Sequence, residues 1–310
     1  MKASYTRVKS QALGRFVLWV PFQQGCNART ACGLYCRRHE AAPCLPPRQE
    51  FTVALPRLIE AQAMNRKEIF EQDGFVAVPG FFDAGGLRTI ETELSRFIAE
   101  RVPALPVEHV FYEDKADAAT LKQIQRLNEY DQFFGELFEG KPKGLAGELL
   151  GEAVVGKNLQ YFNKPPALGQ ATPPHQDGFY FMLKPCRALT MWMALDVVDE
   201  ENGCVRYVRG SHRVGMRPHG RTETLGFSQG ITDYGQAADS RNEVACPAQP
   251  GDLLAHHALT IHRADANIST TRSRRALGFI YYGKSTREDF AAYEAYQAKL
   301  ANELKLTGKI

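Results

Sequence analysis

The chain has 310 residues, of which 44% are hydrophobic and 24% charged, so it can bury one substantial core. Its net charge of +3 is unevenly distributed: residues 1–63 carry nine Lys or Arg and three Asp or Glu, whereas residues 64–310 carry 29 and 32. The larger part is therefore mildly acidic, which gives no indication of a nucleic-acid surface. The apolar run at 16–22 is far too short to span a membrane, so no membrane segment is expected.

Residues 1–63 differ in composition from the rest of the chain. They hold no acidic residue before Glu40, and they contain four of the seven cysteines: Cys26, Cys32, Cys36 and Cys44. The cysteine spacings of six, four and eight do not match the usual zinc-binding pairs. We expect 1–63 to be a disordered extension or residues upstream of a true start at Met64; an Arg-rich organellar import segment is the alternative. Scattered cysteines in odd number predict reduced thiols and a cytoplasmic protein.

The apolar pattern predicts helices first and strands afterwards. Expected helices cover 68–73, ended by Gly74, then 86–101, capped by Asp83, then 118–138 and 145–150. From residue 153 onward we expect strands at 154–162, 180–184, 189–197, 204–208, 242–246, 252–257 and 276–282. A last helix is expected at 287–306. Seven short strands separated by Gly and Pro turns predict a β-sandwich or barrel.

A possible metal site begins with His175-Gln176-Asp177, followed 87 residues later by His262. In an extended strand, residues i and i+2 point to the same side, so His175 and Asp177 could both reach one ion. Two imidazoles and one carboxylate can occupy one face of iron(II) and leave three positions open. His256 and His257 are alternative third ligands, and along a regular strand His256 shares a face with His262. The spacing of His262 to Arg274 favours His262.

Arg274 precedes an apolar strand pattern at 275–282. A guanidinium held at the start of a strand could bind a carboxylate through two parallel hydrogen bonds. Arg272 comes before the strand, and Arg275 points to the opposite face from Arg274. Arg274 is therefore the arginine that we expect to face the interior of a barrel.

From about residue 64 to 282 the chain resembles the phytanoyl-CoA dioxygenase family of iron(II)- and 2-oxoglutarate-dependent oxygenases. The matching stretches, in this order, are 73–82 (DGFVAVPGFF), 163–166 (NKPP), 172–178 (TPPHQDG), 201–204 (ENGC), 210–212 (GSH), 250–252 (PGD) and 261–262 (IH). The chain departs from the family pattern at Arg209, where proline is usual, and at Ala264, where serine is common. These departures leave the metal motif intact and affect the expected co-substrate contacts.

The resemblance implies a mainly β fold with flanking helices, a double-stranded β-helix (jelly roll, cupin-like) with its core at about 153–283 of a domain at 64–310. It implies that His175, Asp177 and His262 hold iron(II). Arg274 is implied to bind the distal carboxylate of 2-oxoglutarate. Thr172 and Trp192 are implied to contribute to the same co-substrate pocket, where each could instead be ordinary core.

The resemblance also implies a reaction: dioxygen and 2-oxoglutarate are consumed, succinate and carbon dioxide are released, and a C–H bond of a small molecule is hydroxylated. Iron halogenases of this fold replace the carboxylate ligand by a small residue, and this chain keeps Asp177, so hydroxylation is expected. The alternatives are a non-catalytic jelly-roll ligand-binding protein and a cupin-type metal-dependent isomerase or hydrolase, for which His257 is the candidate fourth ligand.

The sequence gives less information about the substrate and the partners than about the fold and the metal site. The loop 213–236 carries Arg213, Arg217, His219 and Arg221, which would favour an anionic substrate or would simply face water. We expect a small-molecule substrate and no nucleic-acid, membrane or protein partner, and the fold does not identify the molecule.

Overall fold

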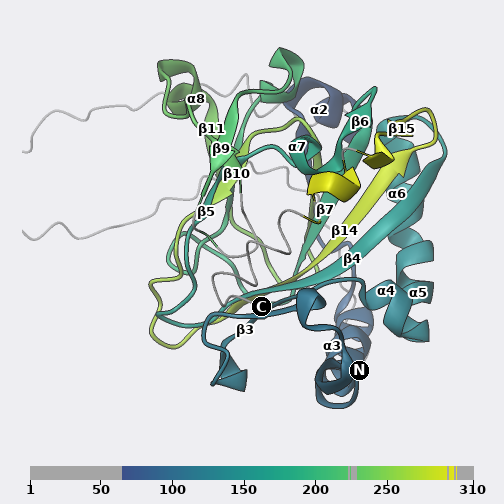
Figure 1. Ribbon diagram of the computed structural model, residues 1–310, viewed down its shortest axis with the longest axis vertical. Coiled ribbons are helices and arrows are strands. Elements are labelled where there is room, and N and C mark those ends of the chain that lie inside the picture. The colour runs from purple at the N-terminus through teal and green to yellow at the C-terminus, as the bar shows by residue number, and fades with distance from the viewer. Residues whose placement is uncertain (1–64, 223, 225–228, 292, 297, 299–310) are drawn as a thin grey trace, which may run out of the picture. The chain divides into compact units, whose positions relative to one another are not determined.

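The computed structural model describes residues 65–222, 224, 229–291, 293–296 and 298 (Figure 1). The expectations for 1–63, including its four cysteines, and for 299–306 of the last helix lie outside these residues. The described chain is built from antiparallel strands with helices packed beside them.

Two antiparallel sheets form the body of the described chain. The larger has seven strands in the order β1-β12-β7-β14-β4-β3-β2, and the smaller has the order β11-β8-β13-β5. Two-stranded sheets pair β10 with β9 and β15 with β6. The strand bounds are β1 Phe75–Val78, β2 Val110–Tyr112, β3 Leu121–Ile124, β4 Val154–Lys164, β5 Thr172–His175, β6 Leu183–Lys184, β7 Ala188–Ala194, β8 Val205–Val208, β9 His219–Arg221, β10 Gln229–Ile231, β11 Glu243–Cys246, β12 Leu253–His257, β13 His262–Ala264, β14 Arg274–Gly283 and β15 Arg287–Glu288.

Helices cover the outer face of the larger sheet (Figure 1). These are α2 Arg66–Asp73, α3 Ala84–Glu100, α4 Leu127–Tyr130, α5 Gln132–Glu139 and α6 Lys141–Leu150. The helical turn α7 Gly178–Phe181 follows β5, and α8 Ala237–Asn242 packs against β8 of the smaller sheet. 3₁₀ turns lie at Val102–Ala104, Val107–His109, Ala118–Thr120 and Ser211–Val214. Within the described residues, no helix is both long enough and apolar enough to cross a membrane.

Side chains of β7 alternate between the two faces of the larger sheet, and each face packs into a different hydrophobic core. Leu189, Met191 and Met193 pack with the helices in one buried cluster, whereas Trp192 and Ala194 pack toward the smaller sheet in another. Successive side chains of a strand point to opposite faces, which explains the division. Two facing antiparallel sheets with helices on one outer face confirm the predicted jelly roll.

The predicted helix at 118–138 is wrong over its first half. After a short 3₁₀ turn, residues Leu121–Ile124 form strand β3, which pairs with β2 and β4, and α-helical structure starts only at Leu127. Arg126 lies between strand β3 and helix α4 and adopts the left-handed conformation, with φ 62°. Neither a strand nor a right-handed helix can continue through a residue in this conformation. Asp131 then starts a new helix, its carboxylate accepting a hydrogen bond from the Phe133 amide. The apolar spacing of Leu121 and Ile124 suited both a helix and this buried strand.

Two other predicted elements are corrected by the structure. The expected strand 180–184 is a helical turn, α7, followed by the short strand β6, because Met182 between them has φ 51°. The expected helix 287–306 begins later, with strand β15 at its start and helical residues only from 290 onward. The other predicted elements are found with shifted ends, and the predicted caps at Asp83 and Gly74 are confirmed.

A prediction concerns the turn before β12. Gly251 has φ +88°, and a Cβ added there would overlap the carbonyl oxygen of Phe82, whose amide donates a hydrogen bond to the Gly251 oxygen. We expect Gly251→Ala to lower the free energy of unfolding by about 1–3 kcal/mol, measured by chemical denaturation. The control is Gly144→Ala in α6, where a Cβ meets nothing within 4 Å, and which should raise stability by roughly 0.5–1 kcal/mol. Unchanged stability of Gly251→Ala would contradict the backbone argument.

Candidate active site

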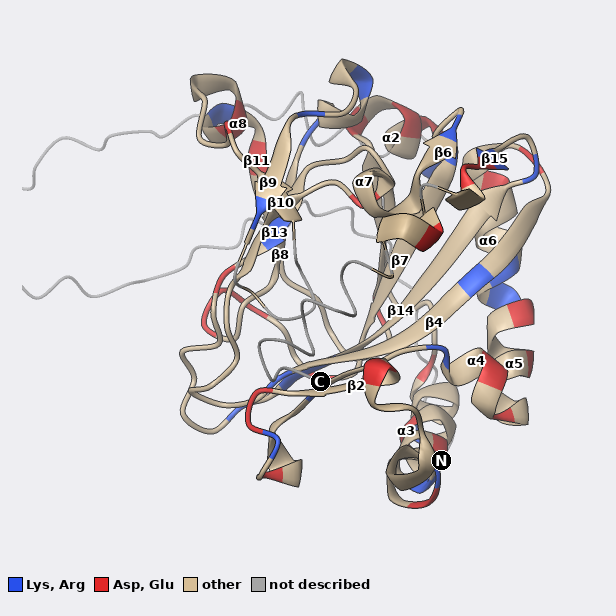
Figure 2. Ribbon diagram, in the orientation of Figure 1, with Lys and Arg blue, Asp and Glu red and all other residues tan. Residues whose placement is uncertain are grey.

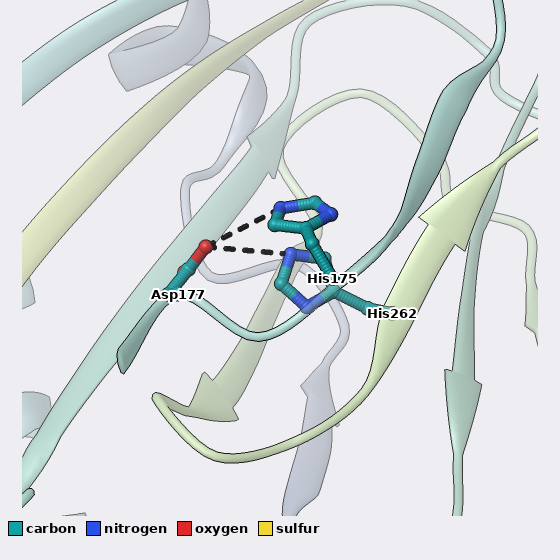
Figure 3. Close-up of side chains that lie close together, drawn as sticks. All are labelled: His175, Asp177 and His262. Atoms are coloured by element: carbon teal, nitrogen blue, oxygen red, sulfur yellow. Dashed lines mark ion pairs between the residues drawn. The ribbon is translucent and has the colours of Figure 1, made fainter. Parts of the chain in front are cut away.

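Three side chains converge between the two sheets. His175 ends β5 and His262 begins the neighbouring strand β13, where the two residues are directly paired. Asp177 lies just after β5, with its Oδ1 3.4 Å from His175 Nε2 and 3.6 Å from His262 Nε2 (Figure 3). One ligand atom from each residue lies within 4.8 Å of the other two, and within the described chain this is the group found able to hold a metal ion.

Asp177 reaches the site differently from the prediction, which placed it on the same extended strand as His175. Asp177 is not on β5: its φ of −57° and ψ of −33° are helical, and it immediately precedes α7. A tight turn rather than i, i+2 strand geometry brings it beside His175. Likewise, His256 and His262 lie on different strands of different sheets, so parity along one strand does not relate them.

Backbone hydrogen bonds orient both imidazoles of the site. His175 Nδ1 is 2.8 Å from the Pro173 oxygen, and His262 Nδ1 is 3.0 Å from the Thr260 oxygen. A carbonyl only accepts, so each Nδ1 carries the proton and each Nε2 presents a lone pair to the centre. This tautomer is the one that a metal-binding histidine needs.

The surroundings of Asp177 and His262 favour the protonation states that bind a metal. Burial alone would raise the pKa of Asp177, but its three histidine neighbours, His262, His175 and His256, hold it well below its usual value. Burial, followed by the proximity of His175 and His256, lowers the pKa of His262 well below the ordinary histidine value. At neutral pH the site therefore contains a carboxylate and a neutral imidazole at His262, which are donors that suit iron(II).

Arg274 lies in the same cavity, which has a volume of about 1250 Å³. The side chain is 5% exposed, and no described residue forms a hydrogen bond or ion pair with its guanidinium. Burial lowers the pKa of Arg274 to about 10, so the guanidinium remains charged at neutral pH. Lys164, opposite Arg274 on β4, is also buried and donates only to the backbone oxygens of Gln170 and Asp265. A buried charge without a counter-charge is costly, so this end of the cavity fits an anion.

The neighbouring arginines point elsewhere. Arg275 pairs with Asp196 at 2.6 Å and Glu91 at 3.2 Å, and Arg272 pairs with Glu201 at 2.6 Å. Trp192 and Thr172 both line the cavity, and the Trp192 ring centroid is 5.3 Å from the Arg274 guanidinium carbon. The structure therefore brings all six predicted site residues into one cavity, with only Arg274 among the three arginines facing it.

Two of the four basic residues in the loop 213–236 have partners within the protein. Arg217 pairs with Asp239 at 2.7 Å and with Asp233 at 3.0 Å, and the His219 ring stacks on Phe179 at 4.4 Å. Only Arg221 of the four cationic residues lines the cavity. Figure 2 shows acidic and basic residues interleaved through the described ribbon. The loop is therefore weak support for an anionic substrate.

Sequence reasoning missed a second layer of polar side chains around Asp177. Thr190 Oγ1 is 2.5 Å and His256 Nε2 3.1 Å from Asp177 Oδ2, and Tyr207 contacts His256 in turn. His256 had a sequence signal, since it was a candidate ligand; Thr190 and Tyr207 had none. His257, the other candidate, accepts a hydrogen bond from the Leu259 amide, and burial lowers its pKa to about 4.

Comparison with known proteins finds one matching family model, described as phytanoyl-CoA dioxygenase, over residues 70–276. The peroxisomal phytanoyl-CoA dioxygenase of Mus musculus is 24% identical over 257 residues, covering 78% of this chain and 74% of the relative. A probable alpha-ketoglutarate-dependent hypophosphite dioxygenase of Stutzerimonas stutzeri is 24% identical, covering 68% and 76%. Among solved structures, the epimerase SnoN in complex with Fe3+, alpha ketoglutarate and nogalamycin RO is 24% identical with a TM-score of 0.59, covering 75% and 86%.

Proposed function

This chain belongs to the phytanoyl-CoA dioxygenase family, and on that premise we propose that it hydroxylates a C–H bond of a small molecule. It is an iron(II)- and 2-oxoglutarate-dependent oxygenase, with dioxygen as the oxidant. We further assign the residues that bind iron and 2-oxoglutarate, the outcome of the reaction and the bounds of the catalytic domain.

We assign iron(II) to His175, Asp177 and His262. The support is the donor set: two imidazoles with lone pairs directed inward and one carboxylate, all within 4.8 Å of one another and lining the cavity. Three ligands on one face leave positions open for 2-oxoglutarate and dioxygen. When bound, these components supply the oxidising chemistry, and the protein binds and orients the reactants.

The observation that carries the co-substrate assignment is the buried guanidinium of Arg274, which has no hydrogen-bond or ion-pair partner among the described residues and lies in the cavity of the proposed metal ligands. A dicarboxylate anchored on Arg274 would supply the missing counter-charge through two hydrogen bonds. Trp192 and Thr172 line the same region and are assigned to the co-substrate pocket. Lys164 adds a second buried amine next to Arg274.

Hydroxylation is the outcome that the donor set favours. The chain keeps a carboxylate at position 177, which occupies the position that a halide needs in the related halogenases. The test is an untargeted search for a metabolite that accelerates succinate formation, followed by mass analysis of that metabolite. A product that gains one oxygen atom supports hydroxylation; a product of unchanged mass identifies an epimerase or isomerase instead.

Two other functions give different results in the same assay. A ligand-binding protein of this fold would bind 2-oxoglutarate without converting it, and a cupin-type isomerase would not consume it. A cupin-type isomerase would require a fourth protein ligand for the metal. His257, the candidate for that role, does not belong to the group of residues found able to hold a metal ion. Continuous consumption of 2-oxoglutarate with iron excludes both.

We also propose that the catalytic domain spans 64–310, with the β-helix core at about 153–283 and residues 1–63 outside it. The buried clusters of the described chain are made of residues from 70 onward. The three described cysteines are free thiols, which suits a reducing compartment such as the cytoplasm.

Deletion of residues 1–63 tests this boundary. We expect the shortened protein to remain soluble, to melt at the same temperature as the full chain and to convert 2-oxoglutarate at the same rate. Differential scanning calorimetry and a succinate assay measure these properties. An insoluble or inactive protein would show that 1–63 contributes to the fold.

A further inference from the structure

The two oxygens of Asp177 have different partners. Oδ1 faces His175 and His262, at 3.4 and 3.6 Å from their Nε2 atoms. Oδ2 points away from them and lies 3.1 Å from His256 Nε2 and 2.5 Å from Thr190 Oγ1. His256 comes from β12 of the larger sheet, is 3% exposed, and stands beside His262 with ring centroids 4.2 Å apart. A third histidine, His256, thus lies within hydrogen-bonding distance of the carboxylate that we assign as a metal ligand.

The direction of the hydrogen bonds follows from the groups involved. A carboxylate oxygen only accepts, so His256 Nε2 carries the proton that it shares with Asp177. His256 Nδ1 then has a lone pair, and the Tyr207 hydroxyl lies 3.0 Å from it. Tyr207 is fully buried, and burial raises its pKa well above the ordinary value, so its hydroxyl stays protonated and can donate. The chain of donors therefore runs from Tyr207 to His256 to Asp177.

We propose that His256, supported by Tyr207, is a positioning residue that restricts Asp177 to one-oxygen coordination of the metal through Oδ1. Hydrogen bonds that occupy Oδ2 prevent the carboxylate from turning and binding through both oxygens. A carboxylate bound through both oxygens would take one of the positions needed by 2-oxoglutarate or dioxygen. Groups behind metal ligands orient those ligands, and the removal of such a group typically weakens metal affinity or activity by about 10–100-fold. The proposal rests on the metal site assigned above.

His256 is not a fourth ligand in this arrangement. Its Nε2 proton is directed at Asp177, and its Nδ1 lone pair is directed at Tyr207, so neither nitrogen has a free lone pair for a metal. Its ligand atoms are also outside the group of three that lies within 4.8 Å. An ordinary buried histidine would satisfy both nitrogens as well, but it would not need to place its proton on a metal-binding carboxylate.

The experiment is a titration of the metal-free full chain with Co(II) alone, monitored by the visible d–d absorption, whose position and intensity report coordination geometry. We expect His256→Phe to weaken Co(II) binding about 10–100-fold and to change the absorption spectrum. His256→Gln should restore part of the affinity, because its amide N–H can donate to Oδ2. Tyr207→Phe should weaken binding by a smaller factor, because it leaves the His256 lone pair without its donor.

The matched control is Tyr281→Phe, which also removes a buried tyrosine hydrogen bond, to the Phe138 oxygen at 2.6 Å, but in the helix-facing core. It should bind Co(II) as the unmodified protein does. Melting temperatures of the metal-free variants separate lost stability from lost metal affinity. If His256→Phe does not fold, Tyr207→Phe and His256→Gln still give the comparison.

Two results would overturn the proposal. If the His256 and Tyr207 variants all bind Co(II) with unchanged affinity and spectrum, His256 is only core packing. If His256→Gln binds no better than His256→Phe, the donated hydrogen bond is not the cause of the effect. Failure of the metal site itself is recognised separately, because His175→Ala would then bind Co(II) as tightly as the unmodified protein.

Discussion

Replacement of any one of His175, Asp177 and His262 by Ala should abolish succinate formation. Each substitution leaves two protein donors, and the site then loses both its affinity for iron(II) and the geometry that keeps adjacent positions open. We expect the rate to fall to that of a metal-free control. Iron content after anaerobic equilibrium dialysis and succinate release together measure the effect.

The controls for this prediction are the two other histidines of the same segment. His257→Ala should retain iron and activity, because His257 bonds to the Leu259 amide rather than to the site. His256→Ala should retain iron with lower affinity, because it removes a hydrogen bond and no metal ligand. A fully active His262→Ala together with an inactive, iron-free His256→Ala or His257→Ala would show that the ligand assignment is wrong.

Replacement of Arg274 by Lys should sharply raise the concentration of 2-oxoglutarate that the enzyme requires. Lysine keeps the positive charge but loses the planar pair of donors that matches a carboxylate. A charged hydrogen bond contributes about 1.5–3 kcal/mol, so the apparent KM for 2-oxoglutarate should increase roughly tenfold to a hundredfold. Initial rates measured across a 2-oxoglutarate titration give this value directly.

Arg275→Lys is the matched control, because Arg275 is the next residue of β14 and points to the opposite face, toward Asp196 and Glu91. It should lose some stability and leave the 2-oxoglutarate requirement unchanged. A large shift for Arg275→Lys with none for Arg274→Lys would reverse the assignment of the two arginines.

The strands that carry the fold were predictable because their side chains alternate between two apolar environments. The predicted strands at 154–162, 189–197, 252–257 and 276–282 correspond to β4, β7, β12 and β14, the central strands of the larger sheet. Strand β7 is buried along its whole length and reads as an apolar run between turns, a pattern that is readable in one sequence.

Strand β3 was misread because it contributes to the cavity rather than to a uniformly apolar core. Lys122 and Gln123 are 9% and 5% exposed, yet Lys122 pairs with Glu113 and Gln123 donates to Gln160 inside the molecule. Polar residues with such partners look like the solvent-facing side of an amphipathic helix when only the sequence is known. The polar side chains that line the cavity therefore made strand β3 difficult to predict from the sequence.

The residues of the candidate site could be predicted to lie together from the sequence, but the geometry of the candidate site could not. The motif containing His175 and Asp177 and the distant His262 could be identified from their spacing, but the turn that carries Asp177 and the pairing of β5 with β13 come only from the structure. The contacts of His256 depend on two sheets that face each other, and no local pattern in the sequence reports such a distance.

The most direct measurement of the central claim uses isotopically labelled dioxygen with the purified protein, iron(II), 2-oxoglutarate and a metabolite extract. We predict that succinate accumulates only when iron is present, and that mass spectrometry finds one labelled oxygen atom in it. Arg274→Lys should give the same labelled product at a higher 2-oxoglutarate concentration. Absence of succinate although iron and 2-oxoglutarate both bind, or succinate without the label, would contradict the assignment of this chain as a 2-oxoglutarate-dependent oxygenase.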